Sequence, residues 1–187
     1  MPSEQALVAV IDTNLIVSAF ISGRGAPHQL LTALRAGAFR LVLSKSLRRE
    51  YADVLARPHL VERYGIDAES VAAFLDLLDR RALLVTPSAD LPLAIRDPKD
   101  AHVLATALAG GATHLVYGDD DFLALVGDPR LGELHIVAAR AFLDTLISPN
   151  MPLRSRSHLS RRNSANSAAE SKDYWSLNVN LDHNQQQ

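Results

Sequence analysis

Residues 6–12 read ALVAVID, a short apolar run that is rich in valine and isoleucine and ends in a carboxylate. Such a run is typical of a strand that is buried on both faces, as in a parallel sheet. Similar runs follow at residues 39–44, 83–86, 114–117 and 133–137. We therefore predict five buried strands.

Segments with helical periodicity separate these runs. Apolar residues repeat with helical spacing over residues 27–36, 47–55, 71–83 and 101–108. Strands that alternate with helices predict parallel βαβ units with right-handed crossovers. The predicted fold class is therefore α/β, a three-layer α/β/α sandwich around a central parallel sheet.

The pattern ends near Ile147, which divides the chain of 187 residues into a domain over 1–147 and a tail over 148–187. Eight serines and six asparagines fall in the tail, which shows scarcely any apolar periodicity. This composition is typical of disorder. Apolar residues over 174–181 leave a short strand or a partner-binding segment as the alternative there.

The composition excludes several kinds of chemistry. The chain has no cysteine, which removes disulfides, thiolate nucleophiles and cysteine-ligated metals. It has no apolar run of the roughly 18 residues that a membrane span needs and no export signal at its start, so we expect a cytoplasmic protein.

The formal charge is −4 over residues 1–149 and +2 over 150–187. An acidic body disfavours nucleic-acid binding by charge alone, unless its carboxylates hold cations.

Two acidic positions directly follow predicted strands. Asp12 closes the strand over 6–12, and Asp119 opens an acidic triplet after the strand over 114–117. Ligands of open α/β sheets bind at the carboxyl ends of the strands, so both positions lie at that edge. The alternatives are a helix N-cap for Asp12 and an exposed acidic turn for the triplet.

Two further carboxylates fall on the apolar stripes of predicted helices. One of them is Glu50, on the stripe of the helix over 47–55. The alternatives to a site role are that its side chain reaches solvent or pairs with Arg57. Asp97, as N-cap, and Pro98 start the next helix, so that Asp100 faces inward from its first turn. Helix N-termini and strand C-termini share one edge of a parallel sheet. We therefore expect one site, made of hard oxygen donors that suit Mg²⁺ or Mn²⁺, from Asp12, Glu50, Asp100 and Asp119.

The ordered set of motifs resembles the PIN domain. The motifs are VIDTN after the first strand, Ser44-x5-Glu50 with Tyr51 behind it, DPKD at a helix start, and LVYGDDDF. Their order and spacing match over residues 6 to about 147, and the most similar group is the toxins of bacterial toxin–antitoxin systems. The resemblance implies a divalent-metal-dependent endoribonuclease that acts on RNA and is inhibited by a cognate antitoxin. We also expect the chain to form a homodimer.

The resemblance also assigns roles to residues. It implies that Asp12, Glu50, Asp100 and Asp119 are the catalytic and metal-binding quartet, with Asp121 as an additional ligand. Supporting or substrate-contacting roles are predicted for Thr13, Asn14, Ser44 and Asp97.

Some features leave the function open. Many relatives carry Asn where Ala101 stands and Ser or Thr where Tyr117 stands, so a catalytically impaired PIN-fold module that binds RNA or a partner protein is the alternative. A phosphorylated receiver or a phosphatase is disfavoured, because Asp12 lacks a DxD pattern. His28 and His102 could support the metal ligands from behind, but an ordinary surface or core histidine is the favoured interpretation of each. The sequence does not rank the basic groups that could guide RNA, which are Arg24, Arg48, Arg49, Arg96 and Lys99.

Overall fold

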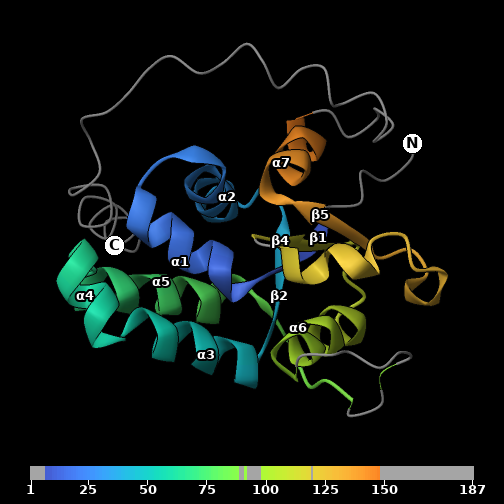
Figure 1. Ribbon diagram of the computed structural model, residues 1–187, viewed down its shortest axis with the longest axis horizontal. Coiled ribbons are helices and arrows are strands. Elements are labelled where there is room, and N and C mark those ends of the chain that lie inside the picture. Colours follow the sequence, from blue (N-terminus) through green and yellow to red (C-terminus); the bar gives the residue numbers. More distant parts are fainter. Residues whose placement is uncertain (1–6, 89–90, 92–97, 119, 148–187) are drawn as a thin grey trace, which may run out of the picture.

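The fold is that of a central parallel sheet covered by helices, as predicted (Figure 1). The computed structural model describes residues 7–88, 91, 98–118 and 120–147, of which 98–100, 120–121 and 123 are described by their backbone alone. The five strands of this part lie in the order β3-β2-β1-β4-β5, and every neighbouring pair is parallel. The predicted tail over 148–187 lies outside the described residues.

Each strand overlaps one of the predicted apolar runs. The strands are β1 (Val8–Ile11), β2 (Arg40–Ser44), β3 (Leu83–Val85), β4 (His114–Tyr117) and β5 (His135–Ala138). β1 is the central strand, and its last three residues are completely buried. Because both of its faces are covered, its sequence is continuously apolar rather than alternating.

Successive strand residues face opposite layers of helices. Val42 of β2 meets the end of α6 (Pro98–Ala109), which packs against β1, β2 and β4. His114 of β4 instead meets Phe142 of α7 (Ala139–Ile147), which packs against α2 (Gly25–Arg35). Figure 1 shows α6 on one side of the strands, with α1 (Thr13–Ser22) and α2 on the other.

The helix over Lys45–Leu55, α3, follows β2 without a break and contacts both α1 and α6. α5 (Ala68–Arg81) packs against α3. The remaining elements are the helix α4 (Pro58–Tyr64) and the 3₁₀ helices η1 (Asp120–Leu125) and η2 (Pro129–Leu131). Neither α4 nor α7 was predicted. α4 buries only one residue, so it has no apolar stripe that periodicity could reveal.

Within the part of the chain that the structure describes, no helix has both the length and the apolar character needed to cross a membrane.

Asp67, the N-cap of α5, gives the fold a measurable pH dependence. Its Oδ1 accepts a hydrogen bond of 2.7 Å from the backbone N–H of Ser70. The pKa of Asp67 is lowered mainly by a hydrogen bond with the side chain of Ser70 and further by backbone N–H groups, that of Ser70 among them. A carboxylate whose pKa is lower in the folded state stabilises the fold above its unfolded pKa of roughly 3.9, and that contribution disappears as the pH falls through the folded pKa.

We therefore expect Asp67→Ala to lower the free energy of unfolding by about 1 kcal/mol at pH 7. The difference from the wild-type protein should shrink as the pH falls below about 4, because the carboxylate is protonated first in the unfolded state and then, below its lowered folded pKa, in both states. Urea denaturation at pH 7 and pH 3 measures both values. A difference that stays the same at both pH values would contradict the assignment of this stability to the charged cap.

Candidate metal centre

Asp12 directly follows β1, at the edge of the sheet where β4 also ends. Its backbone N–H donates a hydrogen bond of 2.9 Å to the carbonyl oxygen of Val116 in β4. Gly118, just after β4, lies so close to α1 that an added Cβ atom would be 3.0 Å from Cγ of Leu15. The chain after β4 therefore passes beside the start of α1, at the edge where the sequence predicts a site.

The side chain of Asp12 is buried, with 6% of its surface exposed. Its carbonyl oxygen accepts hydrogen bonds from the N–H groups of Leu15 and Ile16, so Asp12 is the N-cap of α1 by backbone position. Its carboxylate, however, accepts no capping hydrogen bond from α1. Side-chain capping of α1 therefore does not explain why an acidic residue is buried here.

Glu50 lies on α3 and contacts His102 of α6. The Oε2 atom of Glu50 is 2.6 Å from Nε2 of His102, and each side chain is 26% exposed. From the sequence, Arg57 was the alternative partner of Glu50, and His102 was interpreted as an ordinary histidine. The structure instead gives Glu50 the His102 imidazole, because the packing of α3 against α6 brings the two side chains together.

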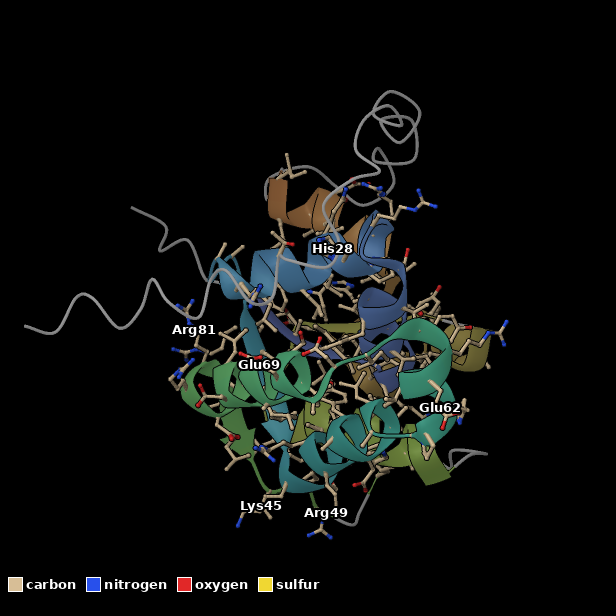
Figure 2. All side chains as sticks on the ribbon, turned by 90° about the vertical axis from the view of Figure 1, so that its left-hand side faces the viewer. His28, Lys45, Arg49, Glu62, Glu69 and Arg81 are labelled. Carbon is tan, nitrogen blue, oxygen red and sulfur yellow. The ribbon has the colours of Figure 1, made fainter. Side chains whose placement is uncertain are left out.

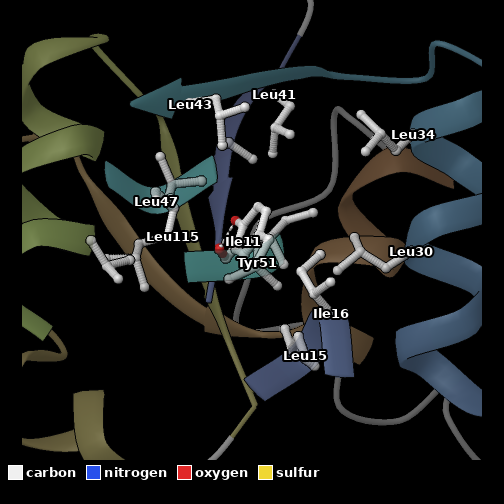
Figure 3. Packing of buried hydrophobic residues seen from close by; sticks show 14 of the residues in the cluster. Ile11, Leu15, Ile16, Leu30, Leu34, Leu41, Leu43, Leu47, Tyr51 and Leu115 are labelled. Carbon is white, nitrogen blue, oxygen red and sulfur yellow. Dashed lines mark hydrogen bonds between the residues drawn. The ribbon is translucent and has the colours of Figure 1, made fainter. Parts of the chain in front are cut away.

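Tyr51, the residue after Glu50, links α3 to the end of β1, which Asp12 follows. Its hydroxyl is completely buried and donates a hydrogen bond of 2.5 Å to the carbonyl oxygen of Ile11, the residue before Asp12 (Figure 3). Burial raises the pKa of Tyr51 well above its ordinary value, and the negative charges of Asp12 and then Glu50 raise it further. The hydrogen bond from Tyr51 to Ile11 thus brings the end of β1, which Asp12 follows, next to the part of α3 that carries Glu50.

Ser44 is buried and joins α3 to α6. Its Oγ accepts a hydrogen bond of 3.2 Å from the N–H of Leu47 and so caps α3. The same oxygen lies 2.9 Å from Oγ1 of Thr106 on α6. The Ser44 hydroxyl is therefore buried between the start of α3 and α6 and does not lie at the surface.

The structure distinguishes the basic groups near this edge. Arg48 is paired with Asp79 at 2.5 Å, and its pKa is raised mainly by that hydrogen bond. Lys45 and Arg49 are exposed, and Figure 2 shows them side by side at one end of the molecule. His28 lies on α2 at the other end of this view, and its pKa is lowered, first by burial and then by Arg35.

A protein-family model described as the PIN domain matches residues 8–121. The chain belongs to the PIN domain family. The match begins in β1, contains Asp12, Glu50 and Asp100, and ends at Asp121. PIN domains have a fold of metal-dependent nucleases and commonly bind RNA. A search of curated proteins found no match to this chain.

Several predicted site residues of this PIN domain lie beyond the described side chains. Asp97 and Asp119 are outside the described residues, and Asp100 and Asp121 are described by their backbone alone. Asp100 lies in the first turn of α6, as predicted, and Asp121 lies in η1. Among the side chains that are described, no group of three or more His, Cys, Asp or Glu residues is placed to hold a metal ion.

Thr13 and Asn14 begin α1 next to Asp12 in the PIN domain. Thr13 is buried, and its hydroxyl has no hydrogen-bond partner among the described residues. Asn14 is exposed, and its carbonyl oxygen accepts a hydrogen bond of 2.8 Å from the hydroxyl of Ser18. Together with Asp12 and Glu50, Thr13 makes the described donors a set of hard oxygen atoms, the kind that Mg²⁺ and Mn²⁺ prefer.

The sequence contained a signal for the contacts of α6 with α3 that were not predicted. His102 and Thr106 are one helical turn apart and interrupt an otherwise apolar helix, AHVLATALA. Polar side chains at i and i+4 lie on one face of a helix, so they mark a face that meets polar partners. The structure provides these partners in Glu50 on α3 and in Ser44, the N-cap of α3.

Proposed function

We propose that this PIN domain is a divalent-metal-dependent endoribonuclease whose ion is held by Asp12, Glu50, Asp100 and Asp119, with Asp121 as an additional ligand. One observation carries the proposal. A hydrogen bond of 2.5 Å joins Tyr51 to Ile11, so the buried carboxylate that follows Ile11 and the half-buried one that precedes Tyr51 are brought to one place, although they are 38 residues apart in sequence. Convergence of this kind is typical of sites rather than of surface charges.

The described residues are suited to hold an ion in a fixed place. When bound, Mg²⁺ or Mn²⁺ activates water and neutralises charge on the phosphate that is attacked. Asp12 directly follows the central strand of the sheet, and the Tyr51 hydroxyl donates a hydrogen bond to the carbonyl oxygen of the preceding residue, Ile11. Glu50 is restrained by His102. Both carboxylates are therefore preorganised, which lowers the entropy that metal binding has to remove.

RNA would approach over the start of α3. Lys45 and Arg49 are exposed there, whereas Arg48 is neutralised by Asp79. The acidic charge of the domain does not oppose this interaction. Without the five proposed ligands, whose charge a bound ion would offset, the rest of residues 1–149 carries a formal charge of +1.

We further propose that the protein is the toxin of a bacterial toxin–antitoxin pair, acts in the cytoplasm and forms a homodimer. This part rests on the similarity of its motifs to those of PIN-domain toxins. It predicts that expression of the chain arrests bacterial growth. It also predicts that a small protein encoded beside it restores growth and binds the chain directly.

The nuclease proposal is tested with 5′-labelled single-stranded RNA and purified protein. We expect cleavage with Mg²⁺ or Mn²⁺, none with EDTA, and recovery when excess Mn²⁺ is added. The products should carry 5′-phosphate and 3′-hydroxyl ends, because water rather than the ribose 2′-hydroxyl attacks the phosphate. Cleavage that persists in EDTA, or 2′,3′-cyclic phosphate ends, would contradict the proposal. Metal-dependent RNA binding without cleavage would instead favour the catalytically impaired module.

A further inference from the structure

The contact between His102 and Glu50 joins two helices at the proposed site. The 2.6 Å contact uses only Oε2 of Glu50. The carboxylate therefore has a second oxygen, Oε1, that this contact does not use.

The surroundings of His102 fix which nitrogen donates. Its Nδ1 atom is buried and has no hydrogen-bond partner in the described part of the chain. A neutral imidazole carries one N–H group, and a buried N–H without an acceptor is costly. The hydrogen-bond network therefore assigns the hydrogen to Nε2, which donates it to Glu50.

A second contact holds the helix turn that carries His102. Thr106 Oγ1 lies 2.7 Å from the carbonyl oxygen of His102 and 2.9 Å from Oγ of Ser44. Ser44 caps the helix on which Glu50 lies. α3 and α6 are thus joined twice, at Ser44–Thr106 and at Glu50–His102, so neither helix can move alone without breaking a polar contact.

We propose that His102 is a positioning residue for Glu50. It holds Oε2 and leaves Oε1 as the donor to the divalent ion, and it removes the rotamer freedom that an unrestrained glutamate would lose on metal binding. The inference rests on the proposed function, because it needs Glu50 to be a metal ligand. Loss of a residue that orients a metal ligand typically weakens metal binding by about 10- to 100-fold.

The test is Mn²⁺ affinity without RNA, measured from the EPR signal of free Mn²⁺ during titration. We expect His102→Ala to weaken Mn²⁺ binding by about 10- to 100-fold. His102→Gln should restore most of the affinity, since its amide N–H can donate to the same oxygen. His59→Ala, which changes an exposed histidine on α4, is the matched control and should bind Mn²⁺ like the wild-type protein. Thermal unfolding and circular dichroism establish that each variant is folded.

A double-variant cycle tests whether His102 acts through Glu50. If it does, His102→Ala should cause no further loss of Mn²⁺ affinity in a protein that already carries Glu50→Gln. Equal Mn²⁺ affinity of the wild-type and His102→Ala proteins would overturn this inference alone. The inference would also be overturned if His102→Gln failed to restore Mn²⁺ binding. The same holds if His102→Ala lowered Mn²⁺ affinity equally in the wild-type protein and in the Glu50→Gln protein. A wild-type protein that binds no Mn²⁺ would instead overturn the proposed metal centre, and this inference with it.

Discussion

Replacement of Asp12 by asparagine should lower the rate of RNA cleavage by about a thousandfold and leave the fold intact. Asparagine has nearly the same shape as aspartate but lacks the charge that attracts a divalent ion. Metal assistance contributes several kcal/mol to such reactions, and about 4 kcal/mol corresponds to a factor of roughly a thousand in rate. Because Asp12 is buried, loss of its negative charge removes a desolvation cost, so the free energy of unfolding should stay within about 1 kcal/mol of the wild-type value.

Single-turnover cleavage of labelled RNA and urea denaturation measure the two quantities on the same protein preparations. Asp53→Asn is the matched control, because Asp53 is an exposed aspartate on α3, three residues from Glu50. It should cleave RNA at the wild-type rate. Wild-type cleavage by Asp12→Asn would remove Asp12 from the site. Equal losses in both variants would show that the effect is not specific to Asp12.

Gly110→Ala should cause the largest loss of stability among conservative changes. Gly110 follows α6, and an added Cβ atom would lie 2.2 Å from Cγ1 of Val42, far inside van der Waals contact. Val42 is completely buried in β2 between two other strands, so it has no space into which to move. We expect the free energy of unfolding to fall by about 3 kcal/mol, the upper part of the range for overpacked cores.

Two comparisons separate this contact from other effects of replacing a glycine. Gly65 has a positive φ of 65° and no atom within 4 Å of an added Cβ, so Gly65→Ala should cost only about 1 kcal/mol, from backbone strain. Val42→Ala should recover part of the stability that Gly110→Ala loses, although Val42→Ala alone is destabilising. Urea denaturation provides all of these values. Additive losses in the double variant would contradict the steric explanation.

The sequence predicted the parts of the fold that depend on local pattern. Buried strands such as β1 are continuously apolar, so their positions along the chain, and the sheet edge at which Asp12 lies, could be inferred. Pro98 marked the start of α6. α4 has different signals, with proline at its first position and a left-handed glycine after its end, but no apolar stripe. We missed it because the prediction relied on periodicity.

The candidate site was only partly predictable because its contacts depend on packing between distant segments. The position of Asp12 follows from one strand, whereas the pair of Glu50 and His102 requires knowledge of how α3 meets α6. The hydrogen bond from Tyr51 to Ile11 likewise joins residues 40 positions apart. The same holds for Gly110, whose importance appears only when the distance to Val42 is known.

The central claim is that a divalent ion binds where β1 ends, beside α3, with Asp12 as a ligand. Mn²⁺ titration of the wild-type, Asp12→Asn and Asp53→Asn proteins, followed by EPR in the absence of RNA, tests this claim most directly. The account predicts that wild-type and Asp53→Asn proteins bind Mn²⁺ equally well and that Asp12→Asn binds it at least about tenfold more weakly. Equal Mn²⁺ affinity of the Asp12→Asn and wild-type proteins would contradict it.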